Sequence, residues 1–459
     1  MYLTTKIQVT RDNHMGINTD VLEKLCYHAA RLYNVALYSV RQHFFNTQSY
    51  LNSYSNYHEC KDNENYHMLL VDNSTQILHL VDRDMVSFFK LLKLKQNGKY
   101  SEKVRLPRYK KKEGLAMYIC CGRTVRIQKD GRTVEIGLTK NFRNAYGFTE
   151  RKLVLPIPAN LRDVTEFKEV RIIPQYGGRQ YSIEFVYESN KQLRQAEGDG
   201  YMAIDLGVDN LAACTIFSSC GVRQFLIDGR KLKNINHYYN KKVAQLKSEY
   251  TKNNGIDSTD TPRMLRLMNG RHNRIDDYFN KAVCMIVDAC LEYGVTKLVI
   301  GYNKEQKRDV NIGRVNNQNL CFIPHDKFRQ KLQYKCELHG IAYCPQEESY
   351  TSKASALDGD FVPTYGDETE HVFSGCRVKR GLYRASDGSV LNADINGSVN
   401  ILRKYLNECE SEGLNPDDVR ALINAPCRRL SAFAQAPSFR WGSLIASLSF
   451  SAQSKRTQD

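Results

Sequence analysis

Residues 201–217, YMAIDLGVDNLAACTIF, contain two apolar runs separated by a short polar turn. Such runs are typical of adjacent strands, and residues 222–228, VRQFLID, predict a third strand beside them. Farther along, residues 295–303 and 340–347 predict two more strands, with a helix over 325–339 between them. This alternation of strands and helices is typical of an α/β domain.

A long basic segment over residues 229–294 separates the third of these strands from the fourth. Its second half has apolar residues at three- and four-residue steps, which predicts an amphipathic helix. Gly294 is the expected C-cap of this helix. The apolar stripe consists of Phe279, Ala282, Val283, Ile286, Ala289, Cys290 and Tyr293.

The N-terminal part of the chain has a different pattern. Residues 3–10, LTTKIQVT, alternate as a strand does, whereas residues 20–94 carry helical periodicity. Within the helical region, residues 53–67 are polar and predict a loop. Several short alternating runs over residues 115–190 then predict strands. The first strand could join this set, which would make the helical region an insertion in a small β-barrel.

Composition narrows the class of protein. The chain has 459 residues, 42% of them hydrophobic, so a disordered chain is not expected. It has no apolar run of the ~20 residues that a membrane-spanning helix needs, and no signal peptide. The scattered Cys residues favour reduced cytoplasmic thiols over a disulfide framework. The net charge of +16 indicates a polyanionic partner, either nucleic acid or an acidic membrane surface.

The positive charge is concentrated in two segments, residues 90–112 and 230–247. Either segment could be a solvated surface, or it could follow a phosphate backbone, since Lys and Arg that neutralise phosphates release counterions. Tyrosines within the segments could stack on bases. The candidate nucleic-acid contacts are Lys103, Arg105, Arg108, Lys110, Lys111, Arg230, Lys231, Lys233, Tyr238, Tyr239, Lys241 and Lys242.

Three acids are candidates for a catalytic site. Asp205 lies within or just after a predicted strand, Glu305 follows another, and Asp394 lies near the start of a predicted helix. The carboxyl ends of strands in α/β sheets gather residues in one crevice, where converging carboxylates would need a hard cation such as Mg²⁺. Taken singly, Asp205 could be a turn residue, Glu305 a surface ion pair and Asp394 a helix cap.

Five ordered motifs lie around these acids: AIDLGVDNLA (203–212), DGRKLKNINHYYNKK (228–242), LVIGYNKEQK (298–307), QEESYTSKAS (346–355) and NADINGSVNILRK (392–404). Together they resemble the TnpB family of insertion-sequence-associated RNA-guided DNA endonucleases, relatives of the type V CRISPR effector nucleases. The resemblance covers most of the chain up to about residue 406 and is strongest from residue 202 onwards.

The resemblance implies a multidomain α+β fold with an N-terminal β-barrel wedge domain and an RNase H-like, RuvC-type nuclease domain. The helical recognition domain is expected as an insertion in the wedge. The implied divisions are 1–15 and 100–195 for the wedge, 16–99 for the recognition domain, 196–406 for the nuclease domain with a degenerate zinc ribbon at about 348–391, and 407–459 for a C-terminal appendage that could be disordered.

The resemblance also implies an activity: cleavage of double-stranded DNA next to a short adjacent motif, directed by a guide RNA from the protein's own locus. Asp205, Glu305 and Asp394 would be the catalytic, metal-binding triad, holding two Mg²⁺ ions, with Mn²⁺ as a substitute. A prokaryotic, nucleoid-associated, cytoplasmic location without membrane partners is expected. The alternatives are an RNA-guided repressor that does not cleave, a strand-transferring transposase and a guide-independent nuclease.

One departure from the family concerns its four-Cys zinc ribbon between the last two catalytic motifs. The expected Cys positions hold Ser355, Asp358, Arg384 and Asp387, and Cys376 is the one thiol in this region. A structural zinc site needs four ligands. No zinc is therefore predicted, and the region is expected to persist as a metal-free loop or hairpin.

Overall fold

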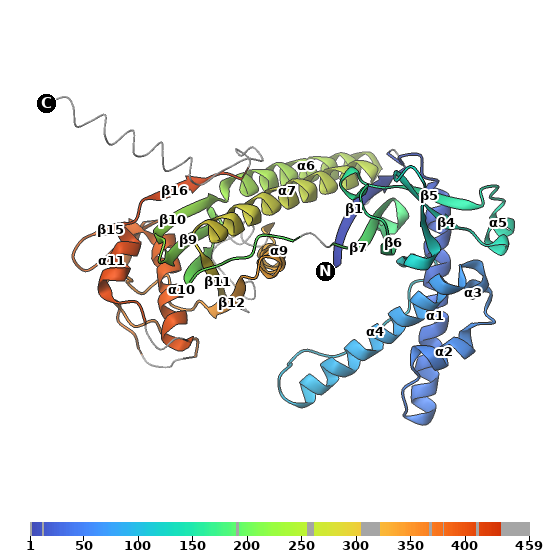
Figure 1. Cartoon of the computed structure of the whole chain (residues 1–459), viewed down its shortest axis with the longest axis horizontal. Helices are drawn as coiled ribbons and strands as arrows, with labels where there is room; N and C mark the ends of the chain where they lie inside the picture. The colour runs from blue at the N-terminus through green and yellow to red at the C-terminus, as the bar shows by residue number, and fades with distance from the viewer. Residues whose placement is uncertain are drawn as a thin grey trace. The chain divides into compact units, whose positions relative to one another are not determined.

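The structure is a computed structural model that describes residues 2–11, 13–189, 192–254, 261–303, 322–366, 370–379, 381–409 and 413–432. The chain has a mixed α/β, multidomain fold and divides into two compact units, residues 1–191 and 192–459 (Figure 1). Across the described ranges, no helix combines the length and apolarity needed to span a membrane.

The first unit is built on a four-stranded sheet in the order β1-β7-β6-β2. Strand β1 (Tyr2–Thr10) pairs antiparallel along its whole length with β7 (Gln180–Glu188). Strands β6 (Phe167–Gln175) and β2 (Tyr118–Cys121) complete the sheet. The first strand therefore pairs with a strand that lies after the whole helical region, as the sequence analysis suggested.

A second, three-stranded sheet consists of β3 (Val125–Ile127), β4 (Thr133–Gly137) and β5 (Lys152–Pro156). The described strands of this unit form these two open sheets, so the predicted closed barrel is not seen there. The 3₁₀ turn η1 (Gly122–Thr124) interrupts the chain between β2 and β3. The Thr124 hydroxyl donates a hydrogen bond to the Asn73 side chain at 2.8 Å, which fixes this turn.

Four helices lie between β1 and β2: α1 (Thr19–Thr47), α2 (Ser53–Cys60), α3 (Glu64–Met68) and α4 (Val71–Gln96). The predicted loop over residues 53–67 is wrong, because α2 and α3 occupy most of it. Asn52 and Asn63 each accept a backbone hydrogen bond at the N-cap of these helices. Such caps stabilise short helices that lack an apolar stripe. Helix α5 (Lys140–Tyr146) and the 3₁₀ turns η2 (Ala159–Leu161) and η3 (Tyr176–Gly178) lie in the loops.

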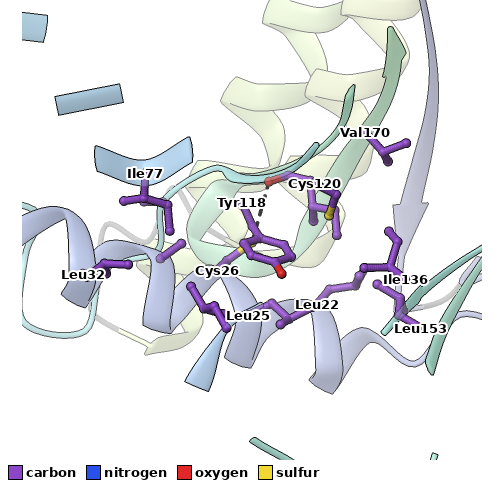
Figure 2. Close-up of a cluster of buried hydrophobic side chains, with 14 of the residues drawn as sticks. Leu22, Leu25, Cys26, Leu32, Ile77, Tyr118, Cys120, Ile136, Leu153 and Val170 are labelled. Carbon is purple, nitrogen blue, oxygen red and sulfur yellow. Dashed lines mark hydrogen bonds between the residues drawn. The ribbon is translucent and has the colours of Figure 1, made fainter. Parts of the chain in front are cut away.

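The core of the first unit forms where α1 and α4 cover the sheet. Figure 2 shows Leu22, Leu25 and Cys26 of α1 packed around Tyr118 of β2, and all four side chains are buried. Burying apolar area stabilises a fold by roughly 25 cal/mol per Å². The α1 side chains in this cluster are among the apolar residues whose helical spacing predicted this helix from the sequence.

The second unit contains a six-stranded sheet in the order β12-β11-β8-β9-β10-β16. Strands β8, β9 and β10 pair antiparallel, whereas β11 is parallel to β8, β12 to β11 and β16 to β10. The bounds are β8 Gly200–Leu206, β9 Asn210–Ser218, β10 Gly221–Asp228, β11 Val295–Tyr302, β12 Ala342–Glu347 and β16 Cys427–Leu430.

Helices cover both faces of this sheet. Successive side chains of a strand point to opposite faces, so Met202 and Ile204 join the core with helices α7 and α9, while Ala203 joins the core with α10 and α11. Helix α6 packs along α7. The bounds are α6 Arg230–Asn254, α7 Pro262–Glu292, α9 His325–Leu338, α10 Ala393–Cys409 and α11 Pro416–Asn424.

Residues 416–430 differ from the predicted appendage, because they form α11 and the edge strand β16. Strand β16 lacks the apolar alternation by which strands are predicted, because it begins with the exposed residues Cys427, Arg428 and Arg429. A small sheet precedes α10 and consists of β13 (Cys376–Lys379), β14 (Leu382–Arg384) and β15 (Val390–Asn392). We call residues 351–392 the lobe.

Candidate active site

Asp205 lies at the end of β8, on the sheet face that contacts α10. By strand alternation it shares this face with Ala203, which packs in the same core as Val399 of α10. The helix meets the carboxylate at Gly397, where an added Cβ would lie 2.7 Å from the Asp205 Oδ2 atom. The absence of a side chain at Gly397 therefore lets the carboxylate pack against the helix backbone.

Asp394 lies in the first turn of α10 and has two donors on its carboxylate. Asn210, the first residue of β9, donates from Nδ2 to Asp394 Oδ2 at 2.6 Å. Arg377 of β13 lies 3.3 Å from Asp394 Oδ1. Asn392 caps the helix by accepting from the Asp394 and Ile395 backbone N–H groups at 3.0 and 3.2 Å.

Both aspartates line one pocket of about 670 Å³, which we call the carboxylate pocket. Four basic side chains also line it, namely Arg230, Lys233, Arg377 and Arg429. The first three are held by acids: Arg230 bonds Asp228, Lys233 bonds Asp209 and Arg377 bonds Asp394. The pocket therefore combines oxygen ligands with cations that could contact a phosphate.

Burial raises the pKa of the Asp205 carboxyl well above its usual range, and the negative charges of Glu348 and Asp394 raise it further. The nearby Arg377 acts in the opposite direction. Within the described ranges, no hydrogen-bond donor contacts the Asp205 carboxylate. A buried carboxylate without compensation is costly, so this position suits a bound cation.

Glu348 is an acid beside this site that the sequence analysis missed. It follows the last residue of β12 and reaches back over β11, where a Cβ added at Gly301 would lie 2.6 Å from Glu348 Oε2. Burial and the neighbouring Glu347 raise the pKa of Glu348 to about 7, although Arg329 lowers it. The rule that placed Glu305 after a strand would also have found Glu348 after the predicted strand at 340–347.

The third predicted acid, Glu305, lies outside the described residues. In the part of the chain that is described, no group of three or more His, Cys, Asp and Glu side chains is arranged to hold a metal ion. The structure thus brings together Asp205 and Asp394, with Glu348 close enough to act on Asp205 electrostatically. Carboxylate oxygens are ligands that Mg²⁺ accepts, so this pair fits such an ion.

The first group of predicted nucleic-acid contacts lies in the first unit, on an extended segment beside α1. Asn34 of α1 holds this segment through two hydrogen bonds with the Lys110 backbone, at 2.7 and 2.9 Å. The Lys110 ammonium lies over the Tyr33 ring, 4.3 Å from its centroid. The other four predicted contacts here, Lys103, Arg105, Arg108 and Lys111, are exposed.

The second group lies on α6. Arg230 and Lys233 line the carboxylate pocket, whereas Lys231, Tyr238 and Lys241 are exposed elsewhere on the helix. The remaining two residues have protein partners. Tyr239 lies beneath the Arg271 guanidinium, 5.2 Å from the ring centroid, and Lys242 donates to Gln245 at 3.3 Å.

In the lobe, three of the four positions where the family resemblance places cysteines, Ser355, Asp358 and Asp387, carry side chains that form hydrogen bonds. The Asp358 carboxylate accepts from the Ser386 backbone N–H at 3.0 Å and from the Ser386 hydroxyl. The Asp358 backbone N–H donates to the Ser355 hydroxyl at 3.3 Å. The turns at 355–360 and 384–389 are therefore joined by a carboxylate and hydroxyl groups.

Asn396 and Asn400 of α10 attach the lobe to this helix. Both side chains are buried and donate to the Ala354 carbonyl, at 2.8 and 2.7 Å. Asn396 also accepts from the Ala356 N–H at 2.9 Å. These amides are therefore structural and do not contact the Asp394 carboxylate.

Two family models match this chain. The model described as "Probable transposase" (OrfB_IS605) matches residues 184–307, and the model described as "Cas12f1-like, TNB domain" matches residues 325–401. A TnpB-like protein, ORF457 of Acidianus two-tailed virus, is 21% identical over 443 residues, which cover 90% of this chain and 90% of that protein.

The structure is also similar to Cas12f1, solved in a complex with sgRNA and target DNA. The TM-score is 0.50 at 14% identity, and the match covers 83% of this chain and 82% of that chain. At this identity the similarity concerns the fold.

Proposed function

Because this chain belongs to the TnpB family, we propose that it is an RNA-guided DNA endonuclease that cleaves double-stranded DNA next to a short adjacent motif. The observation that carries this proposal is the carboxylate pocket, where Asp205 and Asp394 meet between basic side chains. The solved Cas12f1 is a complex with sgRNA and target DNA, which supports a guide RNA and a DNA target as partners here.

In this proposal, Asp205 and Asp394 bind Mg²⁺, and a third acid completes the ligand set. Glu305 is the third acid that the family resemblance implies. Glu348 is the alternative, because it directly follows β12 and its negative charge raises the pKa of Asp205. The bound metal would activate a water molecule and stabilise the departing 3′ oxygen, leaving a 5′-phosphate.

The basic side chains of the carboxylate pocket have a separate task. Arg230 and Lys233 are held at the rim by Asp228 and Asp209, at 2.8 and 2.6 Å. Held in this way, their positive charges could orient the DNA backbone across the pocket. The exposed residues of the two basic segments would bind guide RNA and DNA phosphates elsewhere.

We further propose that the lobe folds without zinc. Asp358 and Asp360 accept hydrogen bonds from serines 28 and 14 residues farther along the chain, respectively. These bonds connect turns that a zinc ion would join in a four-Cys ribbon.

The test is cleavage of a plasmid that matches the co-purified RNA, in the presence of Mg²⁺. Asp205→Ala is expected to abolish cleavage and to retain the RNA. Asp199→Ala is a matched control, because Asp199 precedes β8 at the opposite end and bonds Ser219 at 2.9 Å. Full cleavage by Asp205→Ala would rule out the assigned site. Target binding by the wild-type protein without cleavage would favour the repressor, and joined DNA ends would favour the transposase.

A further inference from the structure

Asn210 occupies a buried position between two strands and the helix that carries Asp394. It is the first residue of β9 and pairs with Asp228 of β10, where the register shifts. Its side chain is buried, yet it also lines the carboxylate pocket. A polar side chain that is buried at the floor of such a pocket needs a partner for each of its polar atoms.

The amide nitrogen of Asn210 is hydrogen-bonded to the Asp394 carboxylate. It donates to Asp394 Oδ2 at 2.6 Å. An ionised carboxylate can only accept hydrogen bonds, so the amide group must present its nitrogen, and not its oxygen, to Asp394. The other Asp394 oxygen is bonded by Arg377 at 3.3 Å, from a side chain that is 48% exposed. The bond from Asn210 is shorter and less exposed, and is therefore the firmer of the two constraints on this carboxylate.

The amide oxygen of Asn210 has no such partner. Its Oδ1 atom is buried and receives no hydrogen bond from any residue in the described ranges. Because the nitrogen must face Asp394, rotating the amide group cannot remove this deficit. An unpaired buried acceptor is unfavourable, so a donor that arrives with a bound ligand would stabilise this arrangement.

We propose that Asn210 is the positioning residue of the nuclease site. Its Nδ2 fixes the Asp394 carboxylate in the orientation that binds the metal ion, and its Oδ1 accepts a hydrogen bond from a water molecule that accompanies the ion. This inference rests on the proposed function and deepens it. Groups that orient metal ligands in this way typically change metal affinity by about 10–100-fold when they are removed.

Two substitutions distinguish the role of the Asn210 Nδ2 donor from that of the Oδ1 acceptor. Asn210→Ala removes both the donor and the acceptor. Asn210→Asp has nearly the same shape and keeps an acceptor, but it replaces the donor with an oxygen that repels Asp394. Asn236→Ala is the matched control, because Asn236 is also a buried amide of this unit, bonded by Arg271 at 2.7 Å, and it does not line the pocket.

The experiment measures Mn²⁺ binding to the purified chain from the electron paramagnetic resonance signal of the free ion, without nucleic acid. Asn210→Ala is expected to weaken Mn²⁺ binding by about 10–100-fold, while Asn236→Ala binds like the wild type. Asn210→Asp is expected to bind Mn²⁺ and to lose plasmid cleavage, because the added carboxylate attracts the ion but no longer orients Asp394. Melting curves verify that each variant is folded.

The outcomes separate this inference from the proposed function. If the wild type binds Mn²⁺ no better than Asp205→Ala does, the proposed metal site fails, and the role of Asn210 fails with it. If the wild type binds Mn²⁺ and Asn210→Ala binds it equally well, the positioning role alone is overturned. Wild-type cleavage by Asn210→Asp would likewise overturn it, since that variant lacks the donor.

Discussion

Replacing Asp360 with alanine tests whether hydrogen bonds replace a metal in the lobe. The Asp360 carboxylate accepts three hydrogen bonds: from the Ser355 N–H at 2.8 Å, from the Ser374 N–H at 3.0 Å and from the Ser374 hydroxyl at 2.6 Å. Ser374 lies two residues before β13. The substitution therefore removes every bond by which this carboxylate joins the 355–360 turn to the strand that carries Arg377.

The expected magnitude follows from the number of bonds. Each one contributes about 1 kcal/mol net, because water replaces the protein donors when the lobe opens. The bond from Ser355 lies within the 355–360 turn, so only the two bonds from Ser374 oppose lobe opening. They give about 2 kcal/mol, which corresponds to about a 30-fold increase in the open population. The bond from Arg403 to the Asp360 backbone oxygen, at 3.0 Å, remains in the variant, so the turn stays attached to α10.

Hydrogen exchange followed by mass spectrometry measures this change locally. Amides of β13, β14 and β15 that exchange through lobe opening should exchange up to about 30-fold faster in Asp360→Ala. Asp387→Ala is the matched control. The Asp387 carboxylate accepts two bonds from Ser389, both at 2.8 Å and both within one turn. Such local bonds can persist when the lobe opens, so exchange should change by less than about threefold.

Two results would refute this reasoning. Equal exchange rates in Asp360→Ala and Asp387→Ala would mean that the bonds from Ser374 to Asp360 do not hold the lobe closed. Faster exchange of the wild-type lobe after treatment with a zinc chelator would mean that a metal, and not these carboxylates, holds it.

Three further predictions concern the acids and the basic segments. If Glu348 is the third metal ligand, Glu348→Gln should lower the rate of cleavage at least 100-fold. If Glu305 is that ligand, as the family resemblance implies, Glu305→Gln should have this effect instead. Wild-type cleavage rates in both variants would contradict a three-acid site. Burial raises the pKa of Asp358, but hydrogen bonds with Ser355 and Ser386 outweigh it, so the pKa is lowered in the folded state. The stability that Asp358 contributes is therefore present above the unfolded Asp pKa of about 3.9 and is lost as the pH falls through the folded value. Urea unfolding of Asp358→Ala and wild type should accordingly differ at pH 7 and converge in acid; a constant difference would contradict this. Lys231→Glu and Lys241→Glu should each reduce the salt dependence of RNA binding by about one phosphate contact, and an unchanged slope would indicate a solvated helix surface.

The sequence allowed five strands of the second unit, β8 to β12, to be predicted because their apolar runs are long and uninterrupted. Asp205 could be singled out because a carboxylate among the apolar residues of a strand is costly without compensation. Asp394 could be singled out by its place near a helix start within a motif that resembles the family. The structure places both in one pocket. The sequence could not show how closely α10 approaches the sheet, because that depends on Gly397 facing Asp205.

The features that were missed depend on pairing between distant segments. Strand β16 is short and basic, and its strand character arises from pairing with β10, which local periodicity does not reveal. Glu348 comes near Asp205 because Gly301 leaves space for it. Asn210 is separated from Asp394 by 184 residues, so no local pattern of residues could reveal their hydrogen bond.

The measurement that tests the central claim most directly compares two plasmids that differ only in a stretch complementary to the RNA that co-purifies with the chain. Both are incubated with the purified ribonucleoprotein and Mg²⁺. The account predicts that the matched plasmid is cut and that the mismatched plasmid stays intact. Equal cutting of both plasmids, or unchanged cutting after the RNA has been digested, would contradict it.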